Sequence, residues 1–241
     1  MDPDPLLFLY DYPEKKNREI AGLIAACFAY GRVDQIMKTV GHILEKLCPS
    51  PYEYLLGVAE KEIANDFKGF RYRFASESHL VNFLWGIKNV LNEFESLENC
   101  FYSGHSPVNE TVLPGLVFFS GKINKNKKIG HLMADPEKKS ACKRSLLFLR
   151  WMVRKDLVDP GGWKKISPSQ LIVPIDTHMY KTGRMLEFTR RKSPDMKTAL
   201  EITRGFRKIL SCDPVKYDFS LTRFGIRKGL NMDHLKDFIL G

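Results

Sequence analysis

Asp176 is the acidic residue whose position is most suggestive of chemistry. It follows the short apolar run 173–175 and stands directly before a helical pattern that passes through Met179, Gly183 and Leu186. A carboxylate at this position accepts the free N–H groups of the first helical turn, so Asp176 is expected to be an N-cap. The same N–H donors keep the carboxylate ionised. Asp176 could therefore also stabilise a cation that develops beside it.

Positive charge is concentrated around this residue. The chain has 38 Lys and Arg against 28 Asp and Glu, a formal net charge of +10. Residues 138–192 contain fourteen of the basic residues and only four acidic ones. Such a segment can bind phosphates, and we therefore expect DNA as the partner, although a basic chain is also compatible with a merely solvated surface.

Aromatic and basic side chains alternate in a second segment, Phe70-Arg71-Tyr72-Arg73-Phe74. This pattern suits stacking on bases together with phosphate contacts. Alternation of core and surface side chains explains it equally well, and both interpretations stay open. Trp151 and Trp163 are expected in the core.

Several classes of protein are excluded by what the sequence lacks. The five cysteines are far apart, with no C-x-x-C pair for zinc or an iron–sulfur cluster, so we expect no metal and no cofactor. No nucleotide-binding glycine loop and no Ser-His-Asp order is present. No apolar run is long enough to span a bilayer, and the N-terminus does not resemble a secretory signal. We expect a cytoplasmic protein with no membrane partner.

Helical periodicity dominates the chain and predicts an all-α protein with about ten helices. The residues expected to position the chemistry lie in a helix over 141–155, which the sequence 159–162 ends, and in the helix that Asp176 begins. Other helices are expected near 17–31, where Asn17 would be the N-cap, and at 33–47, 52–64, 78–94 and 197–210. Two further helices are expected near 104–120, and a last one begins near Pro214.

The segment VPIDTHMYKTGRMLEF (173–188) resembles the signature of the helix-hairpin-helix DNA glycosylase superfamily, which includes endonuclease III and the archaeal 8-oxoguanine glycosylases. Weaker similarity extends to residues 18–33, 80–101 and 216–226. The chain also resembles a bacterial family without an established activity, through patterns at 18–26, 70–74, 142–144, 148–154 and 176–178.

The superfamily resemblance implies a lysine that attacks the sugar C1′ while the aspartate, here Asp176, stabilises charge. Alignment with the archaeal pattern puts the lysine position on Arg144, which cannot lose its proton. We therefore expect Lys143 as the nucleophile, with Lys139 as the second candidate. The glycine-containing hairpin of the superfamily is missing, because residues 131–139 occupy its place without a glycine.

These observations predict a two-lobed glycosylase-like fold. The inner lobe would span 33–155, and the second lobe would consist of 1–32 and 156–241, with DNA bound to a monomer in the cleft between them. We assign DNA contacts to Arg32, Arg71, Arg73, Arg144, Arg154 and His178. The predicted function is excision of a damaged base, first 8-oxoguanine, with or without cleavage at the abasic site. Two alternatives remain, a non-catalytic DNA-binding protein and a protein-interaction scaffold.

Overall fold

The computed structural model describes residues 3–125 and 128–224, and within these residues it contains eleven α-helices and one two-stranded sheet. The prediction of an all-α protein is confirmed at this level. The helices are α1 (Lys15–Cys27), α2 (Val33–Lys46), α3 (Pro51–Gly57), α4 (Glu60–Asp66), α5 (Glu77–Phe94), α6 (Leu97–Ser103), α7 (Leu113–Ile123), α8 (Lys143–Val153), α9 (Thr177–Met185), α10 (Met196–Ile209) and α11 (Asp218–Phe224). The strands β1 (Arg71–Tyr72) and β2 (Ala75–Ser76) form a hairpin, and short 3-10 turns lie at Pro5–Leu9 and Pro168–Gln170.

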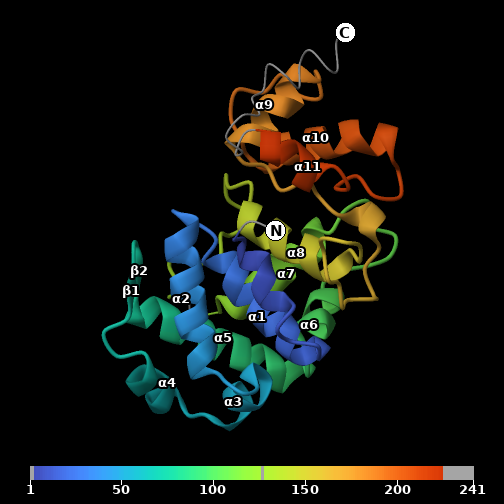
Figure 1. Ribbon diagram of the computed structural model, residues 1–241. Helices are drawn as coiled ribbons and strands as arrows, with labels where there is room; N and C mark the ends of the chain where they lie inside the picture. The colour runs from blue at the N-terminus through green and yellow to red at the C-terminus, as the bar shows by residue number, and fades with distance from the viewer. Residues whose placement is uncertain (1–2, 126–127, 225–241) are drawn as a thin grey trace.

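The helices are arranged in two parts (Figure 1). Helices α1 to α8 form a larger body, and α9, α10 and α11 form a smaller one above it. Helix α1 packs against α8, α3 and α6 inside the larger body. The lobe boundaries drawn from the sequence, 33–155 against both chain ends, remain a prediction.

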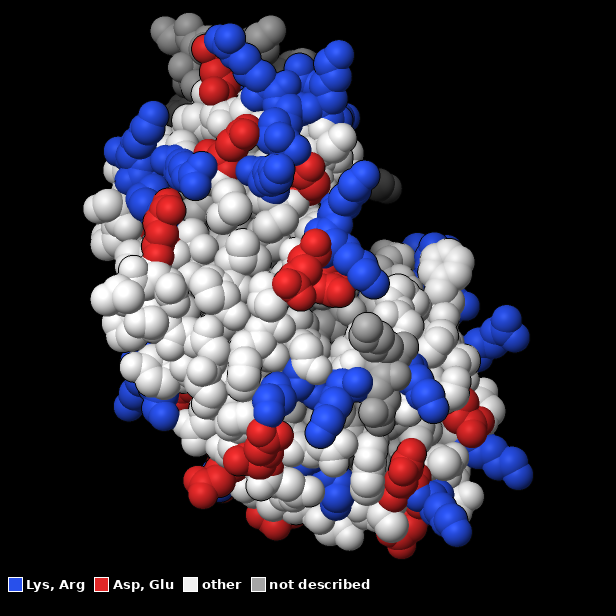
Figure 2. Space-filling model, turned by 180° about the vertical axis from the view of Figure 1, so that it is seen from behind, with Lys and Arg blue, Asp and Glu red and all other residues white. Residues whose placement is uncertain are grey.

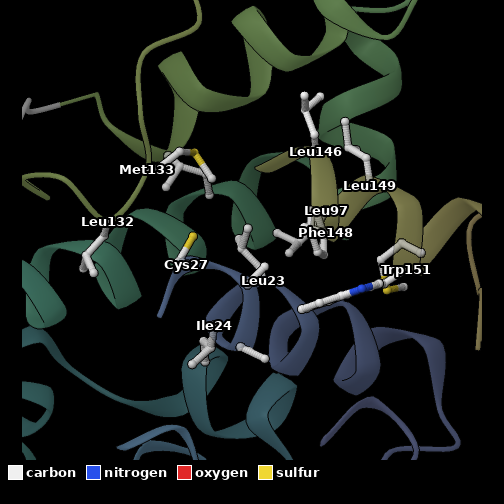
Figure 3. Packing of buried hydrophobic residues seen from close by; sticks show 14 of the residues in the cluster. Leu23, Ile24, Cys27, Leu97, Leu132, Met133, Leu146, Phe148, Leu149 and Trp151 are labelled. Atoms are coloured by element: carbon white, nitrogen blue, oxygen red, sulfur yellow. The ribbon is translucent and has the colours of Figure 1, made fainter. Parts of the chain in front are cut away.

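The core of the larger body lies between α1 and α8. Leu23, Ile24 and Cys27 of α1 are fully buried, as is Leu149 of α8. Figure 3 shows Leu23 beside Leu97 and Phe148, while Ile24 and Leu149 point to other parts of the core. All residues of α1 from Glu19 to Cys27 are buried, so this helix is enclosed by its neighbours on all sides rather than along one stripe. Trp151 and Trp163 are each only 3% exposed, which confirms that they belong to the core.

Several predicted helix starts are wrong. Helix α8 begins at Lys143 rather than at 141, and α7 begins at Leu113 rather than near 104. Two further starts have a cause that the structure shows. Helix α1 begins at Lys15 rather than at Asn17, and the Asn17 side chain is buried, where its Oδ1 atom accepts from Ser50 Oγ and from the Tyr52 N–H. Helix α5 is capped by Ser76, whose Oγ accepts from the His79 N–H, and it therefore begins before Ser78. Asparagine is a favourable N-cap residue, but the Asn17 side chain is used by its contacts with Ser50 and Tyr52, which are distant in the chain.

The connection between α7 and α8 consists of turns in its described part, 128–142, rather than of a helical hairpin. The region expected as one helix at 52–64 forms two, α3 and α4. Within the described residues, no helix is both long and apolar enough to cross a membrane.

Candidate functional site

Asp176 is the N-cap of α9, as its position in the sequence predicts. Its Oδ1 atom accepts hydrogen bonds from the N–H groups of His178 at 2.9 Å and Met179 at 2.8 Å. The preceding residues are buried, and the Val173 N–H donates to Thr203 Oγ1 of α10 at 3.0 Å. This contact fixes the chain ahead of α9. One carboxylate oxygen satisfies the helix end, so the other oxygen is available for a second partner.

The second partner is Lys143. Helix α8 begins at this residue, after Cys142, which adopts the left-handed conformation with φ of 50°. The Lys143 Nζ atom lies 3.4 Å from Asp176 Oδ2. The Lys143 side chain is 39% exposed and that of Asp176 is 19% exposed, so the pair is partly desolvated and still open to a ligand.

Both residues line a cleft of about 580 Å³, within the range of about 300–1,000 Å³ typical of ligand sites. Its walls come from segments far apart in the chain, namely residues 4–6, residues 29–31, helix α8, and helix α11 of the smaller body. Figure 2 shows that the back face is indented between the two parts of the molecule and that basic side chains lie on both sides of the indentation.

Asp218, the first residue of α11, is a cleft residue that sequence reasoning missed. Its side chain is 3% exposed, and Oδ2 accepts from Arg150 Nη1 of α8. The Oδ1 atom has no hydrogen-bond partner among the described residues. Burial raises the pKa of the Asp218 carboxyl, and the charge of Asp176 raises it further, whereas Arg150 lowers it. The cleft therefore contains a second carboxyl group whose charge is sensitive to Asp176.

Arg150 and Arg154 form a buried ionic network that connects the two bodies. Arg150 pairs with Asp159 at 3.0 Å as well as with Asp218. Arg154 is 5% exposed and pairs with Asp159, with Asp156 at 2.7 Å and with Asp213 at 3.0 Å. The expectation that Arg154 contacts DNA is therefore corrected, because its guanidinium is buried and is used by carboxylates of the same chain.

Arg144 is also mostly engaged within the protein, although it lines the cleft. Its guanidinium donates to the carbonyl oxygens of Cys27 and His131 and lies 4.9 Å from the centre of the Tyr30 ring. These contacts hold the turn after α1 against α8. Lys139 is exposed and is not among the residues that line the cleft, so the structure brings Lys143 to Asp176 and leaves Lys139 outside.

The other residues assigned to DNA contacts lie around the cleft rather than in it. Arg32 is exposed and pairs with Asp34 at 3.1 Å. Arg71 and Arg73 are exposed on the β1–β2 hairpin. His178 is half-buried in the first turn of α9 and does not line the cleft. Among the described residues, no group of three or more His, Cys, Asp or Glu could hold a metal ion.

Comparison with known protein families identifies one family that matches the chain. The model of DUF2400, described as a protein of unknown function, matches residues 4–227. The chain belongs to the DUF2400 family. No curated protein and no solved structure matches it. The DUF2400 match spans the cleft, the Lys143–Asp176 pair and Asp218.

The arrangement in this DUF2400 protein can support amine chemistry. A lysine amine becomes a nucleophile when its proton is removed, and an ionised carboxylate 3.4 Å away can stabilise a nearby cation. The backbone N–H groups on Asp176 Oδ1 hold the carboxylate in one orientation. The site thus combines a carboxylate held in one orientation, Asp176, with an accessible amine, Lys143.

Proposed function

We propose that this protein is a DNA glycosylase that removes a damaged base through the Lys143 amine. The observation that carries the proposal is the 3.4 Å approach of Lys143 Nζ to Asp176 Oδ2 inside the cleft. The resemblance of residues 173–188 to the helix-hairpin-helix glycosylases assigns the role of the aspartate to Asp176. The contact between Lys143 and Asp176 supports Lys143, rather than Lys139, as the nucleophile.

The proposed reaction begins with loss of a proton from the Lys143 ammonium to solvent. The free amine then attacks C1′ of the nucleotide while the bond between C1′ and the base breaks, and the departing base takes up a proton. Loss of a proton from nitrogen and opening of the sugar ring give a Schiff base between Lys143 and C1′. Asp176 stabilises the positive charge that develops on the sugar.

Charge favours a nucleic acid as the substrate. The net charge of +10 and the exposed Arg32, Arg71 and Arg73 suit a phosphate backbone. The cleft volume of about 580 Å³ can take a single base that has left the stack. We propose 8-oxoguanine as the first base to test, because the archaeal 8-oxoguanine glycosylases show the resembling pattern.

Sodium borohydride trapping tests the proposal, because it reduces a Schiff base to a stable covalent adduct. We would incubate the full chain with duplexes that each contain one damaged base, opposite each normal base in turn, and with an undamaged duplex as the control. A covalent protein–DNA band that requires damage supports the proposal. DNA binding without an adduct favours the non-catalytic DNA-binding alternative, and absence of DNA binding favours the scaffold.

A further inference from the structure

The β1–β2 hairpin presents a phenyl ring to solvent. Arg71 pairs with Ser76, and Tyr72 pairs with Ala75, which leaves Arg73 and Phe74 as the two residues of the turn. Tyr72 is buried, whereas Phe74 is 73% exposed. An alternation of core and surface side chains therefore explains why Tyr72 is buried and why Arg71 and Arg73 are exposed. It does not explain Phe74, which this alternation would place in the core.

The turn is held in a conformation that costs free energy. Arg73 has φ of 50°, the left-handed region that residues with a side chain seldom adopt. Its guanidinium stays close to Gly31, where a Cβ atom would lie 2.9 Å from Arg73 Nη1, and 5.8 Å from the Phe74 ring. The strained turn places a cation and an aromatic ring side by side at the tip of the hairpin.

The hairpin is attached to the rim of the cleft. The Tyr72 hydroxyl donates to the Tyr30 carbonyl at 2.5 Å, and Tyr30 and Gly31 both line the cleft. On the other side, the ring of Phe74 lies 5.8 Å from that of His131, which in turn packs edge-on against Tyr30. Figure 1 shows the hairpin at the edge of the larger body, beside α2.

We propose that Phe74, together with Arg71 and Arg73 of the same hairpin, forms a stacking platform for an unpaired nucleobase beside the cleft. The phenyl ring stacks on a base that has no partner in the duplex, and Arg71 and Arg73 contact the adjoining phosphates. The positive charge of Arg73 beside the ring and of Arg71 on the same hairpin favours a polyanion, and a π face accepts any base without reading its edge. This deepens the proposed function by naming its partner: DNA that contains an unpaired nucleotide.

Fluorescence anisotropy tests the platform with two labelled duplexes, one fully paired and one with a single unpaired nucleotide. We expect Phe74→Ala to weaken binding of the second duplex by about tenfold and to leave the salt dependence unchanged, because stacking involves no counterion release. Phe74→Tyr keeps the π face and should bind as the wild type does. Arg71→Gln should instead reduce the salt slope by about 0.9 for both duplexes.

Leu157→Ala is the matched control, because Leu157 is 97% exposed and belongs to a different surface. Equal affinity of wild type and Phe74→Ala, or an equal loss in Leu157→Ala, would overturn the platform. Binding that depends on Phe74 without any trapped adduct would retain the platform and refute the glycosylase. An adduct formed normally by Phe74→Ala, with unchanged binding, would refute only the platform. Absence of DNA binding would refute both.

Discussion

The ammonium group of Lys143, at the start of α8, lies 3.4 Å from the Asp176 carboxylate at the start of α9. The contact joins the larger and the smaller body across one wall of the cleft. The Asp176 carboxylate caps α9 with its Oδ1 atom and faces the Lys143 amine with its Oδ2 atom. The two roles can be separated by substitution.

Asp176→Asn is expected to fold normally and to lose chemistry. Asn caps a helix about as well as Asp, whereas Asp176→Ala should lower the free energy of unfolding by about 1 kcal/mol. The Asn variant should bind damaged DNA as the wild type does and release the base at least about 10²-fold more slowly, because the negative charge is lost. Thermal melting and single-turnover base release measure the two effects. Release at the wild-type rate by the Asn variant would show that Asp176 is a cap only.

The buried network should be important for stability. Asp159 is fully buried and pairs with both Arg150 and Arg154. Asp159→Ala leaves Arg150 with Asp218 and Arg154 with Asp156 and Asp213, but buried guanidinium N–H groups lose their acceptor. The free energy of unfolding should therefore fall by about 1–3 kcal/mol. Urea denaturation measures this change. Asp34→Ala, which removes an exposed pair with Arg32, is the control and should shift the urea midpoint far less than Asp159→Ala does.

Glu19 predicts a pH dependence of stability. This buried carboxyl accepts from the N–H groups of Leu97 and Glu98 and from Trp163 Nε1. Burial nevertheless raises the pKa of Glu19 from 4.5 to about 7. The folded state thus holds the proton more tightly than the unfolded state does. The contribution of Glu19 to stability should therefore be largest at low pH, fall between about pH 4.5 and 7, and stay constant above.

Glu19→Gln removes this titration. The difference in free energy of unfolding between wild type and variant should change across that window by at most about 1.4 kcal/mol per pH unit. Urea midpoints at pH 5, 6, 7 and 8 provide the measurement. Parallel pH profiles of the two proteins would contradict the assignment.

Salt dependence should distinguish exposed from buried arginines. The logarithm of DNA affinity should fall with the logarithm of salt concentration by about 0.9 per phosphate neutralised. Arg32→Gln should reduce this slope by about 0.9 at most, with no loss of thermal stability. Arg154→Gln should instead lower the melting temperature, because Arg154 pairs with three carboxylates. A DNA affinity of the wild type that does not change with salt concentration would remove DNA as the partner.

The sequence was informative where local chemistry determines the structure. The position of Asp176 before a helical pattern predicts its role as N-cap, and the apolar residues of α1 and α8 predict that both helices belong to the core. The contact of Asp176 with Lys143 could be expected only through the glycosylase resemblance, since no local rule relates two helix starts so far apart in the chain.

Two residues show why the rest could not be predicted. The sequence predicts a surface position for Arg154, because arginine is rarely buried without partners. Its partners include Asp213, which is distant in the chain and comes close only in the folded protein. Asp218 stands between Tyr217 and Phe219 with no local signal, and only the packing of α11 beside α9 and its bond to Arg150 place it in the cleft.

The most direct measurement is identification of the lysine that a trapped DNA adduct modifies. After borohydride reduction with an 8-oxoguanine duplex, or with the damaged duplex that traps best, peptide mass spectrometry should locate the sugar on Lys143. Lys143→Gln should abolish the adduct and keep duplex binding within a few-fold, whereas Lys139→Gln should be trapped like the wild type. An adduct on Lys139, or undiminished trapping of Lys143→Gln, would contradict the assignment of Lys143 and Asp176 as the reacting pair.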